Sequence, residues 1–331
     1  MSFKIAVIGC GHMATEGHGP SFRKYASIHS DVELTACCDK NETAAAQFQM
    51  KFGFSRWYTD WEEMLDTESP DAVSLVVPVH LTAELFIRIC EKGFPVMTEK
   101  PPGMNRTEAL RMIEAAKRFG VPNQAAFNRR HMPLVNKMKQ QLSATLDPSD
   151  IHHIRYDLSR VNRKDADFST TAIHGIDTVK HLLGSDYGHV RFRYQDVGEP
   201  GSDIVNIYMD CTFESGATAQ LNFCPISGGV IERATVHGRG HSFHMHLPVW
   251  GSPDLPGRLI HMHSNEVLAD LSGSDITDGE ELFETNGFYA ENASFFDDIR
   301  AGRRPVDDIR SGLQSVEIAD CIRRRLEEYA P

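Results

Sequence analysis

The sequence has little positive charge and lacks both a long hydrophobic run and a paired-cysteine motif. Among its 331 residues, 34 are Lys or Arg and 46 are Asp or Glu, so the formal net charge is −12 at pH 7. A nucleic-acid partner usually requires a basic surface, and this balance argues against one. No stretch approaches the ~20 apolar residues that cross a membrane. We therefore expect neither a nucleic-acid nor a membrane partner.

The seven cysteines also exclude a disulfide framework. Their number is odd, no C-x-x-C pair occurs, and most lie within apolar segments. Such cysteines are typical of buried thiols in a reducing compartment. The opening segment MSFKIAVIGCG is apolar over too few residues for a secretory signal. The sequence thus predicts a cytoplasmic protein.

The pattern of apolar residues changes near residue 130. Up to that point, predicted strands at 3–9, 32–39, 71–77, 95–99 and 121–128 alternate with predicted helices at 41–51, 81–92 and 105–120. This alternation is typical of an α/β domain with a doubly wound parallel sheet. We place that domain at residues 1–127 and a second domain at 128–331.

The second domain has long segments that alternate apolar and polar residues, at 151–161, 189–197, 203–213, 217–226, 233–240 and 242–249. These predict a large, mostly antiparallel open sheet. One helix is predicted at 171–184, and two more at about 286–301 and 306–329. The second domain is therefore also expected to be α/β.

A glycine-rich turn follows the first predicted strand. Gly9, Gly11 and Ala14 have G-x-G-x-x-A spacing, with His12 and Met13 between them, directly before a helical pattern. Glycines here allow a tight turn and close approach of a pyrophosphate, and the helix N-terminus favours the negative charge. The alternative is an ordinary glycine turn. Its context favours a dinucleotide site.

An acidic residue follows the second strand, as this kind of site requires. A carboxylate at Asp39 would accept hydrogen bonds from both ribose hydroxyls and repel a 2′-phosphate, which favours NAD over NADP. The neighbouring Lys40 could offset a phosphate, so NADP remains an alternative cofactor.

The segment PVMTEKPPG, residues 95–103, places a lysine where a buried strand ends. Pro101 holds Lys100 extended and prevents a helix from continuing there. Ligands of open parallel sheets bind beyond the carboxyl ends of the strands. Lys100 is therefore expected near the reacting centre.

Taken together, these motifs resemble the Gfo/Idh/MocA family of oxidoreductases, which includes glucose–fructose oxidoreductase and inositol dehydrogenase. The matching segments span the chain in the family's order: GCGHMA, Asp39, VVPVHLTAEL, EKPPG, FNRR, HGIDTVKHLLG and FYAENASFFDDIRAGRRP.

The resemblance implies a Rossmann NAD(P)-binding domain and a second domain that binds substrate and forms homodimers or homotetramers through its sheet. It implies that Lys100 lies beside nicotinamide and substrate, and that Pro78, His80, Glu99 and Asn128 line the cofactor. The implied reaction is hydride transfer between nicotinamide and a hydroxyl or keto carbon of a sugar, sugar derivative or cyclitol.

Hydride removal from an alcohol needs a proton acceptor and a cation for the developing alkoxide. Lys100 can supply the cation, and His174 can act as acid and base because imidazole titrates near neutral pH. A core histidine is the alternative for His174. Dehydrogenases of the family commonly carry an aspartate one turn before this histidine, where this chain has Thr170.

Further residues are candidates for binding substrate. Thr170 and Asp177 could orient the substrate or the histidine, and Arg129, with Arg130 beside it, could grip a polyhydroxylated or anionic substrate. Ion pairing on the surface is the alternative for the two arginines.

Two H-x-H pairs, His244/His246 and His261/His263, would each share one strand face. They could form a metal site if the strands were neighbours, but no carboxylate or cysteine accompanies them. We expect no metal.

Two other functions stay open. The missing aspartate is compatible with a non-catalytic, NAD(P)-sensing regulator. A glycosidase or lyase that oxidises its substrate transiently with bound NAD is the second alternative.

Overall fold

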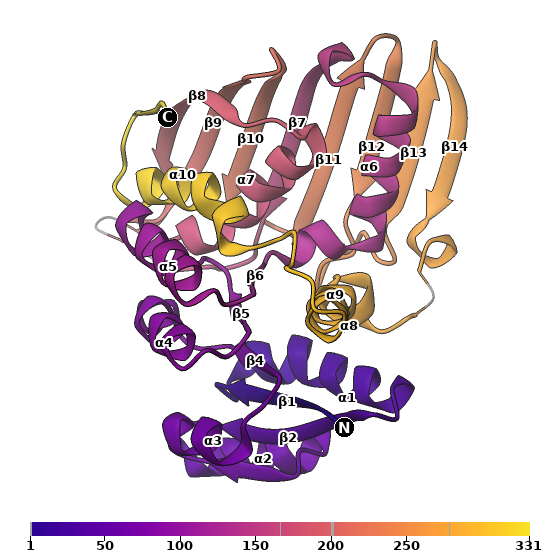
Figure 1. The fold of residues 1–331 in the computed structure, drawn as a ribbon. Coiled ribbons are helices and arrows are strands. Elements are labelled where there is room, and N and C mark those ends of the chain that lie inside the picture. Colours follow the sequence, from indigo (N-terminus) through magenta and orange to yellow (C-terminus); the bar gives the residue numbers. More distant parts are fainter. Residues whose placement is uncertain (1, 166, 200–201, 278) are drawn as a thin grey trace. The chain divides into compact units, whose positions relative to one another are not determined.

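The computed structural model describes residues 2–165, 167–199, 202–277 and 279–331. The chain divides into two compact units (Figure 1). Unit 1 comprises Met1–Asn128 and Gly287–Val316, and unit 2 comprises Arg129–Asn286 and Glu317–Pro331. The first junction lies one residue beyond the expected boundary. The ranges differ at the C-terminal segment, because residues 287–316 group with unit 1 rather than with the second domain.

Unit 1 contains a six-stranded parallel sheet with the strand order β3-β2-β1-β4-β5-β6. The strands are β1 (Phe3–Ile8), β2 (Val32–Cys38), β3 (Arg56–Tyr58), β4 (Ala72–Leu75), β5 (Val96–Glu99) and β6 (Asn123–Ala126). This is the doubly wound order of dinucleotide-binding domains, with its switch point between β1 and β4. The predicted Rossmann-type sheet is confirmed.

The helices of unit 1 carry clear end signals. They are α1 (Gly19–Ile28), α2 (Glu42–Phe52), α3 (Trp61–Glu68), α4 (Val79–Glu91), α5 (Arg106–Phe119) and α9 (Phe288–Arg300). Asn41 caps α2 by accepting the Ala44 N–H, and Asn105 caps α5 by accepting the Glu108 N–H. Strand β3 was not predicted because its three residues are too few to show a period, and the eight-residue helix α3 was not predicted either.

A π-helical turn, η1 (Ala14–His18), precedes α1. Such turns insert one extra residue into a helix and are frequent at functional sites. The glycines on either side of His18 allow close packing here. A Cβ on Gly17 would lie 2.7 Å from the Phe288 ring, and one on Gly19 would lie 2.5 Å from the Phe52 ring.

Aromatic packing holds α9 in unit 1. Phe296 contacts the rings of Phe3, Phe22 and Tyr25, and the Tyr25 hydroxyl donates to Asp297 at 2.6 Å. Phe22, Phe295 and Phe296 are fully buried. Because each buried aromatic side chain removes a large apolar area from water, this cluster accounts for the return of the chain to unit 1.

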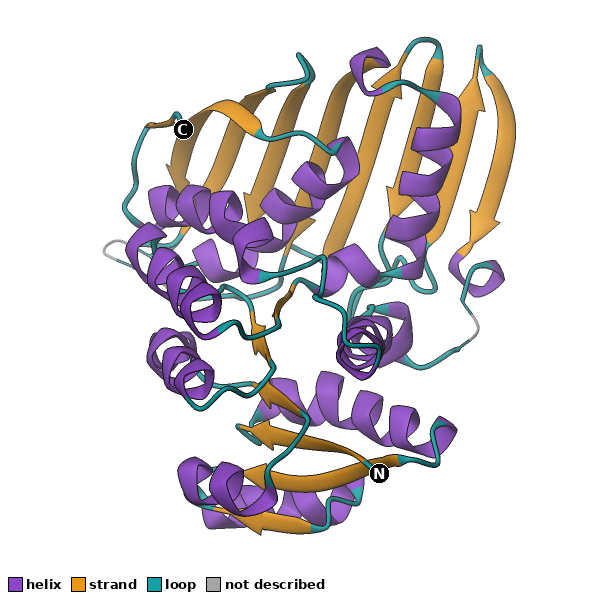
Figure 2. Ribbon diagram, viewed as in Figure 1, coloured by secondary structure: helices purple, strands orange, loops and turns teal. Residues whose placement is uncertain are grey.

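Unit 2 is built on a nine-stranded sheet with the order β14-β13-β12-β11-β7-β10-β9-β8-β15 (Figure 2). Among the described strand pairs of this sheet, only β7 and β10 are parallel. The strands are β7 (Ile151–Ser159), β8 (Tyr187–Asp196), β9 (Val205–Phe213), β10 (Thr218–Cys224), β11 (Ile231–Gly238), β12 (His241–His246), β13 (Arg258–His263), β14 (Glu266–Ser272) and β15 (Glu328–Tyr329). The predicted large, mostly antiparallel sheet is confirmed.

Helices cover one face of this sheet. Helix α6 (Pro133–Thr145) contacts β12 and β13, and α7 (Ser169–Leu183) contacts β7 and β10. Ile154, Tyr156 and Leu158 of β7 are buried on the helix side, whereas Arg155 and Asp157 point to the other face. The opposite face is polar and half-exposed, and we call it the open sheet face.

The predicted helix at 306–329 is wrong in extent. The chain instead forms a 3-10 turn, η5 (Ile309–Gly312), then α10 (Leu313–Arg323), and ends near β15. Arg325 has a positive φ of 55°, which a helix does not allow. Strand β14 and helices α6 and α8 (Leu282–Thr285) were not predicted, and β13 was predicted only where the His261/His263 pair was placed on a strand.

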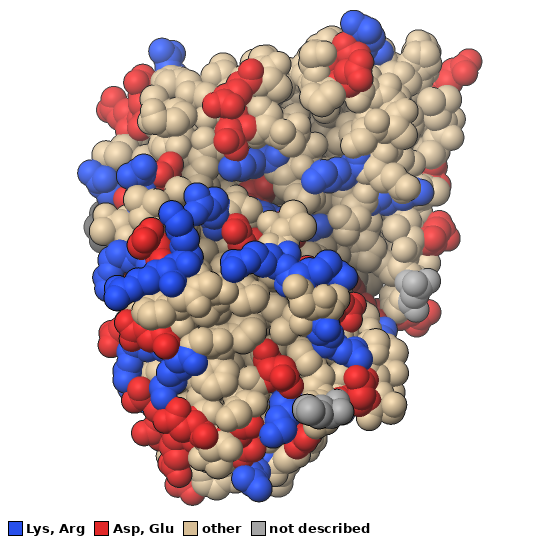
Figure 3. Space-filling model, viewed as in Figure 1, with Lys and Arg blue, Asp and Glu red and all other residues tan. Residues whose placement is uncertain are grey.

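Within the described residues, no helix has both the length and the apolarity needed to cross a membrane. All seven cysteines are free thiols, five of them buried. On the face drawn in Figure 3, Lys and Arg side chains lie among Asp and Glu.

Candidate active site

The carboxyl edge of the unit 1 sheet gathers the predicted cofactor residues. Gly9 follows β1, Asp39 follows β2, and Lys100 follows β5. Because these strands are parallel, their carboxyl ends meet at one edge. Asn128 lies beyond β6, in the 3-10 turn η2 (Asn128–His131), and is buried.

Gly9 makes the turn that starts this edge. Its N–H donates to Cys38 O at 2.8 Å, and its φ is +99°. A Cβ at this position would lie 2.0 Å from Val76 O on the neighbouring strand end. Only glycine satisfies both the positive φ and this close approach.

Gly11 serves a different purpose from Gly9. An added Cβ on Gly11 would meet no protein atom within 4 Å, so the space above it is open. His12 is exposed and Met13 half-buried at the start of the helix, and Ala14 is buried against the core. An open, glycine-lined helix N-terminus fits a pyrophosphate, which the helix dipole and free N–H groups would hold.

The Asp39 carboxylate is held in place by the backbone. Oδ2 accepts the Cys10 N–H at 2.9 Å, and Oδ1 accepts the Asn41 N–H at 2.8 Å. Each carboxylate oxygen has a further lone pair for a ribose hydroxyl. Asp39 is half-exposed, which leaves it reachable from solvent. The residues present therefore fit a dinucleotide.

Pro78 and His80 mark the start of α4. Pro78 is its N-cap residue, and His80 lies in the first turn. Both side chains are exposed. They follow β4 at the same sheet edge as the Gly9 turn.

Glu99 and Lys100 form the end of β5. Glu99 Oε2 accepts the Lys100 N–H at 3.0 Å, and Oε1 accepts a hydrogen bond from His18 Nε2 at 2.9 Å. Burial opposes ionisation of Glu99. The His18 hydrogen bond and the charge and N–H of Lys100 outweigh it and lower the pKa of the carboxyl. The Lys100–Pro101 peptide bond is cis.

His18 was not among the residues predicted to form the site. Its imidazole is 1% exposed and also contacts Asn292 of α9. The signal present in the sequence is the G-H-G triplet, in which two glycines flank a histidine inside a helical pattern.

Helix α7 of unit 2 carries the predicted acid/base residue. Thr170 and His174 are half-exposed, whereas Thr171, Ala172 and Ile173 are buried. Residues four apart share a helix face, so Thr170 and His174 form one polar strip. Just before this helix, Asp167 Oδ1 accepts the Ser169 N–H at 2.9 Å.

Arg130 and Asp177 form a buried pair rather than a surface contact. Arg130 Nη2 donates to Asp177 Oδ1 at 2.7 Å, and Arg130 Nε donates to Oδ2 at 2.8 Å. Asp177 is 1% exposed. This geometry ties η2 to α7, and it favours a structural role for Asp177 over the predicted contact with substrate.

Arg129 is likewise buried and paired with a carboxylate. Its Nε and Nη2 each donate to Glu232 at 3.0 Å, and Arg160 and the Tyr156 hydroxyl donate to the same carboxylate at 2.7 and 2.6 Å. Burial disfavours the charge of Glu232, but the two arginines outweigh it and lower its pKa. The expected alternatives for Arg129 were substrate binding and surface pairing; the structure shows an interior ion pair.

The two H-x-H pairs do not converge. Strands β12 and β13 are neighbours, but His244 lies opposite Ile260, whereas His261 lies opposite Phe243. The two pairs therefore face opposite sides of the sheet. His261 instead contacts His241, with 3.0 Å between ring nitrogens. Among the described residues, no group of three or more metal-ligating side chains is placed to hold an ion.

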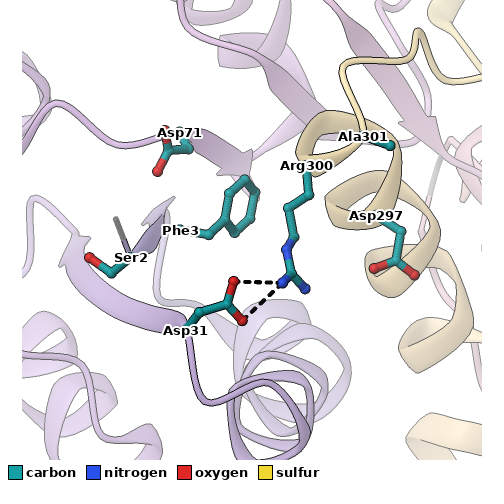
Figure 4. A pocket seen from close by; sticks show the side chains of 7 residues that line it. All are labelled: Ser2, Phe3, Asp31, Asp71, Asp297, Arg300 and Ala301. Carbon is teal, nitrogen blue, oxygen red and sulfur yellow. Dashed lines mark hydrogen bonds and ion pairs between the residues drawn. The ribbon is translucent and has the colours of Figure 1, made fainter.

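A cavity of about 530 Å³ in unit 1 lies away from the predicted site (Figure 4). Ser2, Asp31 and Asp71 line it just before β1, β2 and β4, and Arg300 of α9 pairs with Asp31 at 2.7 Å. These residues precede their strands, so the cavity lies at the amino edge of the sheet. Ligands of such sheets bind at the carboxyl edge.

Comparison with known proteins bears on the identity of the chain. Residues 3–127 match the family model described as "Oxidoreductase family, NAD-binding Rossmann fold", named GFO_IDH_MocA. The chain is 23% identical over 314 residues to a scyllo-inositol 2-dehydrogenase (NAD(+)) of Bacillus subtilis, with 92% of this chain and 88% of the relative covered. It is also 23% identical to a myo-inositol 2-dehydrogenase of Thermotoga maritima, with 98% and 96% covered.

Solved structures share the fold. A levoglucosan dehydrogenase in complex with NADH and levoglucosan superposes with a TM-score of 0.83 at 19% identity, with 99% of each chain covered. A dehydrogenase from Chromobacterium violaceum gives a TM-score of 0.82 at 21% identity, with 97% and 94% covered. None of these relatives carries the name of a regulator or a glycosidase. The glycine turn, the acidic residue after β2 and these matches lead to one conclusion: residues 3–127 form an NAD-binding Rossmann domain of the Gfo/Idh/MocA family, and the chain is an NAD(P)-dependent oxidoreductase acting on CH–OH groups.

Proposed function

We propose that this enzyme transfers a hydride between NAD and a hydroxyl-bearing carbon of a sugar, sugar derivative or cyclitol. The observation that carries the proposal is Lys100 at the end of β5, on the same sheet edge as the Gly9 turn and Asp39. Relatives named inositol and D-glucoside dehydrogenases support the substrate class.

Lys100, His174 and Thr170 have separate roles in this reaction. Bound nicotinamide supplies the hydride acceptor or donor. Lys100 stabilises the negative charge that develops on the substrate oxygen, and His174 takes or returns its proton. The Thr170 hydroxyl, on the same face of α7, hydrogen-bonds the substrate. Arg129 and Asp177 hold the surrounding backbone through their buried ion pairs.

Asp39 supports NAD as the preferred cofactor. Its two oxygens are already aimed by backbone N–H groups, so accepting ribose hydroxyls needs no rearrangement. A 2′-phosphate would meet this negative charge directly. NADP is the alternative, because a relative named as an NADP-dependent scyllo-inositol 2-dehydrogenase matches 42% of the chain at 30% identity.

A substrate panel tests the proposal. Purified protein is assayed for NADH formation with aldoses, sugar acids, amino sugars and inositols, beside Lys100→Met and the matched surface variant Lys92→Met. We expect turnover with at least one polyol, a fall in kcat of about 10²–10⁴-fold in Lys100→Met, and little change in Lys92→Met. Full activity in Lys100→Met would remove Lys100 from the reaction.

We also propose that the enzyme is a cytoplasmic homodimer or homotetramer that assembles through the open sheet face. This face carries half-buried polar side chains such as Tyr208, Asn222 and Thr235, the kind that a second copy can hydrogen-bond. The free thiols support a reducing compartment.

A further inference from the structure

A buried hydrogen-bond chain lies directly behind Lys100. It runs from Asn292 of α9 through His18 of η1 to Glu99 of β5, and all three residues belong to unit 1. Asn292 and His18 are 0% and 1% exposed, and the Glu99 side chain is 11% exposed. These buried polar groups hydrogen-bond one another, so each of them has a defined role as donor or acceptor.

The protonation of His18 follows from its partner. Asn292 Nδ2 donates to Phe288 O at 2.7 Å, and since a carbonyl oxygen only accepts, this contact fixes which end of the amide is the nitrogen. The same Nδ2 lies 3.0 Å from His18 Nδ1, closer than Oδ1 at 3.3 Å. His18 Nδ1 is therefore the acceptor, and the ring proton sits on Nε2.

That proton points at Glu99. His18 Nε2 lies 2.9 Å from Glu99 Oε1, while Glu99 Oε2 accepts the Lys100 N–H at 3.0 Å. Both carboxylate oxygens thus receive a donor, one from η1 and one from the residue proposed to carry the reaction. The carboxylate also adds a negative charge one residue from the Lys100 ammonium.

The local backbone and the neighbouring rings hold the His18 imidazole in place. The π-helical turn Ala14–His18 turns His18 inward, and the ring lies between Phe22 and Phe288, with centroids at 6.0 and 5.4 Å. Gly17 has no Cβ to collide with Phe288. Such a precise fit at one histidine exceeds what packing a core requires, because a leucine would fill the same space without a buried polar network.

We propose that His18 is a positioning residue for hydride transfer: fixed by Asn292, it donates to Glu99 and so keeps the carboxylate ionised and the Lys100 backbone in place. The inference rests on the proposed role of Lys100. The charged or titratable groups that act on the Glu99 carboxyl are His18 and Lys100, and the buried Glu291 precedes Asn292 on α9.

Three variants test this. His18→Leu removes the donor. His18→Gln keeps it, because the glutamine Nε2 reaches the place of the imidazole Nε2. His29→Gln is a matched control at the other end of the same helix. For each we measure the kcat/KM profile against pH and the titration of the Glu99 carboxyl by ¹³C NMR, assigned with Glu99→Gln.

In His18→Leu we expect the midpoint of the Glu99 titration to move up by about one pH unit. The buried carboxylate then loses one of the hydrogen bonds that favour its charged form. We expect kcat to fall ~10–100-fold, as it does when a reacting group is misplaced. The acidic side of the kcat/KM profile against pH should shift together with the titration of Glu99. His18→Gln should restore the titration and most of kcat, and His29→Gln should match the parent.

Two results would overturn the inference. One is an unchanged Glu99 titration in His18→Leu. The other is a shifted titration with the parent's kcat/KM profile, which would make the network purely structural. The NMR titration needs no turnover, so failure of the network is distinguished from failure of Lys100 itself, which the Lys100→Met variant reports.

Discussion

At the scale of single residues, Thr170 is the difference from the family pattern that most affects the chemistry, because dehydrogenases of the family commonly carry an aspartate there. It shares a face of α7 with His174, and its hydroxyl carries no charge. A carboxylate there would favour the imidazolium form of His174 and raise the pH at which it acts as a base.

Thr170→Asp tests this reading of His174. We expect the acidic side of the kcat/KM profile, plotted against pH, to move up by about one pH unit. Thr170→Asn, which has the same shape without the charge, should leave that side of the profile where the parent has it. Equal profiles for the two variants would show that His174 is not the group that titrates.

At the scale of elements, the turn from β1 into the helix separates folding from binding. Gly9 has a positive φ and approaches Val76 O, whereas Gly11 faces open space. The first glycine is required by the backbone, and we expect the open space at the second to take the pyrophosphate.

Alanine at each position should therefore give opposite outcomes. Gly11→Ala should keep the parent's melting temperature and weaken NAD binding at least tenfold, read by quenching of protein fluorescence. Gly9→Ala should lower the melting temperature or prevent folding, because its Cβ meets the Val76 carbonyl. A Gly11→Ala protein that binds NAD normally would contradict the proposed path of the pyrophosphate.

The buried carboxylate of β11 joins three elements of unit 2. Glu232 receives Arg129 from η2 and Arg160 and Tyr156 from the β7 region. Its folded pKa lies below the usual value, so its contribution to stability is fully present above about pH 4.5. That contribution is lost as the pH falls from there toward the folded pKa.

We expect Glu232→Gln to lose about 3–5 kcal/mol of unfolding free energy at pH 7, since it leaves buried arginines without their charge partner. The gap to the parent, measured by urea denaturation, should narrow below pH 4.5. Asp165→Asn, which removes the exposed ion-pair partner of Arg163 outside the sheet, is the control and should change little. If the difference in unfolding free energy between parent and variant stays constant with pH, the lost stability comes from changed packing rather than from the missing charge.

Local sequence patterns predict positions at the ends of strands. Gly9, Gly11, Asp39 and Lys100 each follow a strand and carry a local signature, so their place at the sheet edge could be predicted from the sequence. His18 and Asn292 were missed, because their hydrogen bond joins residues 274 apart in sequence, which no local period reports. The same long range put residues 287–316 into unit 1, through contacts between α9 and α1.

At the scale of the whole molecule, charge and the open sheet face decide which partners are possible. With a net charge of −12, self-association cannot rely on long-range attraction between copies, so it must come from close contact. The open sheet face offers such contact over nine strands, with polar side chains that are only half-exposed already in the single chain.

Thr235 of β11 lies half-buried on this face, opposite Arg155 of β7 and His244 of β12. Thr235→Glu would put a charge from each copy into a shared interface, where unpaired charges are costly. We expect the parent to elute as a dimer or tetramer in size-exclusion chromatography with light scattering, and Thr235→Glu to shift toward monomer. Thr43→Glu, the same change on the exposed surface of α2, should leave the parent's mass unchanged. A monomeric parent, or a Thr235→Glu protein of unchanged mass, would show that assembly does not use this face.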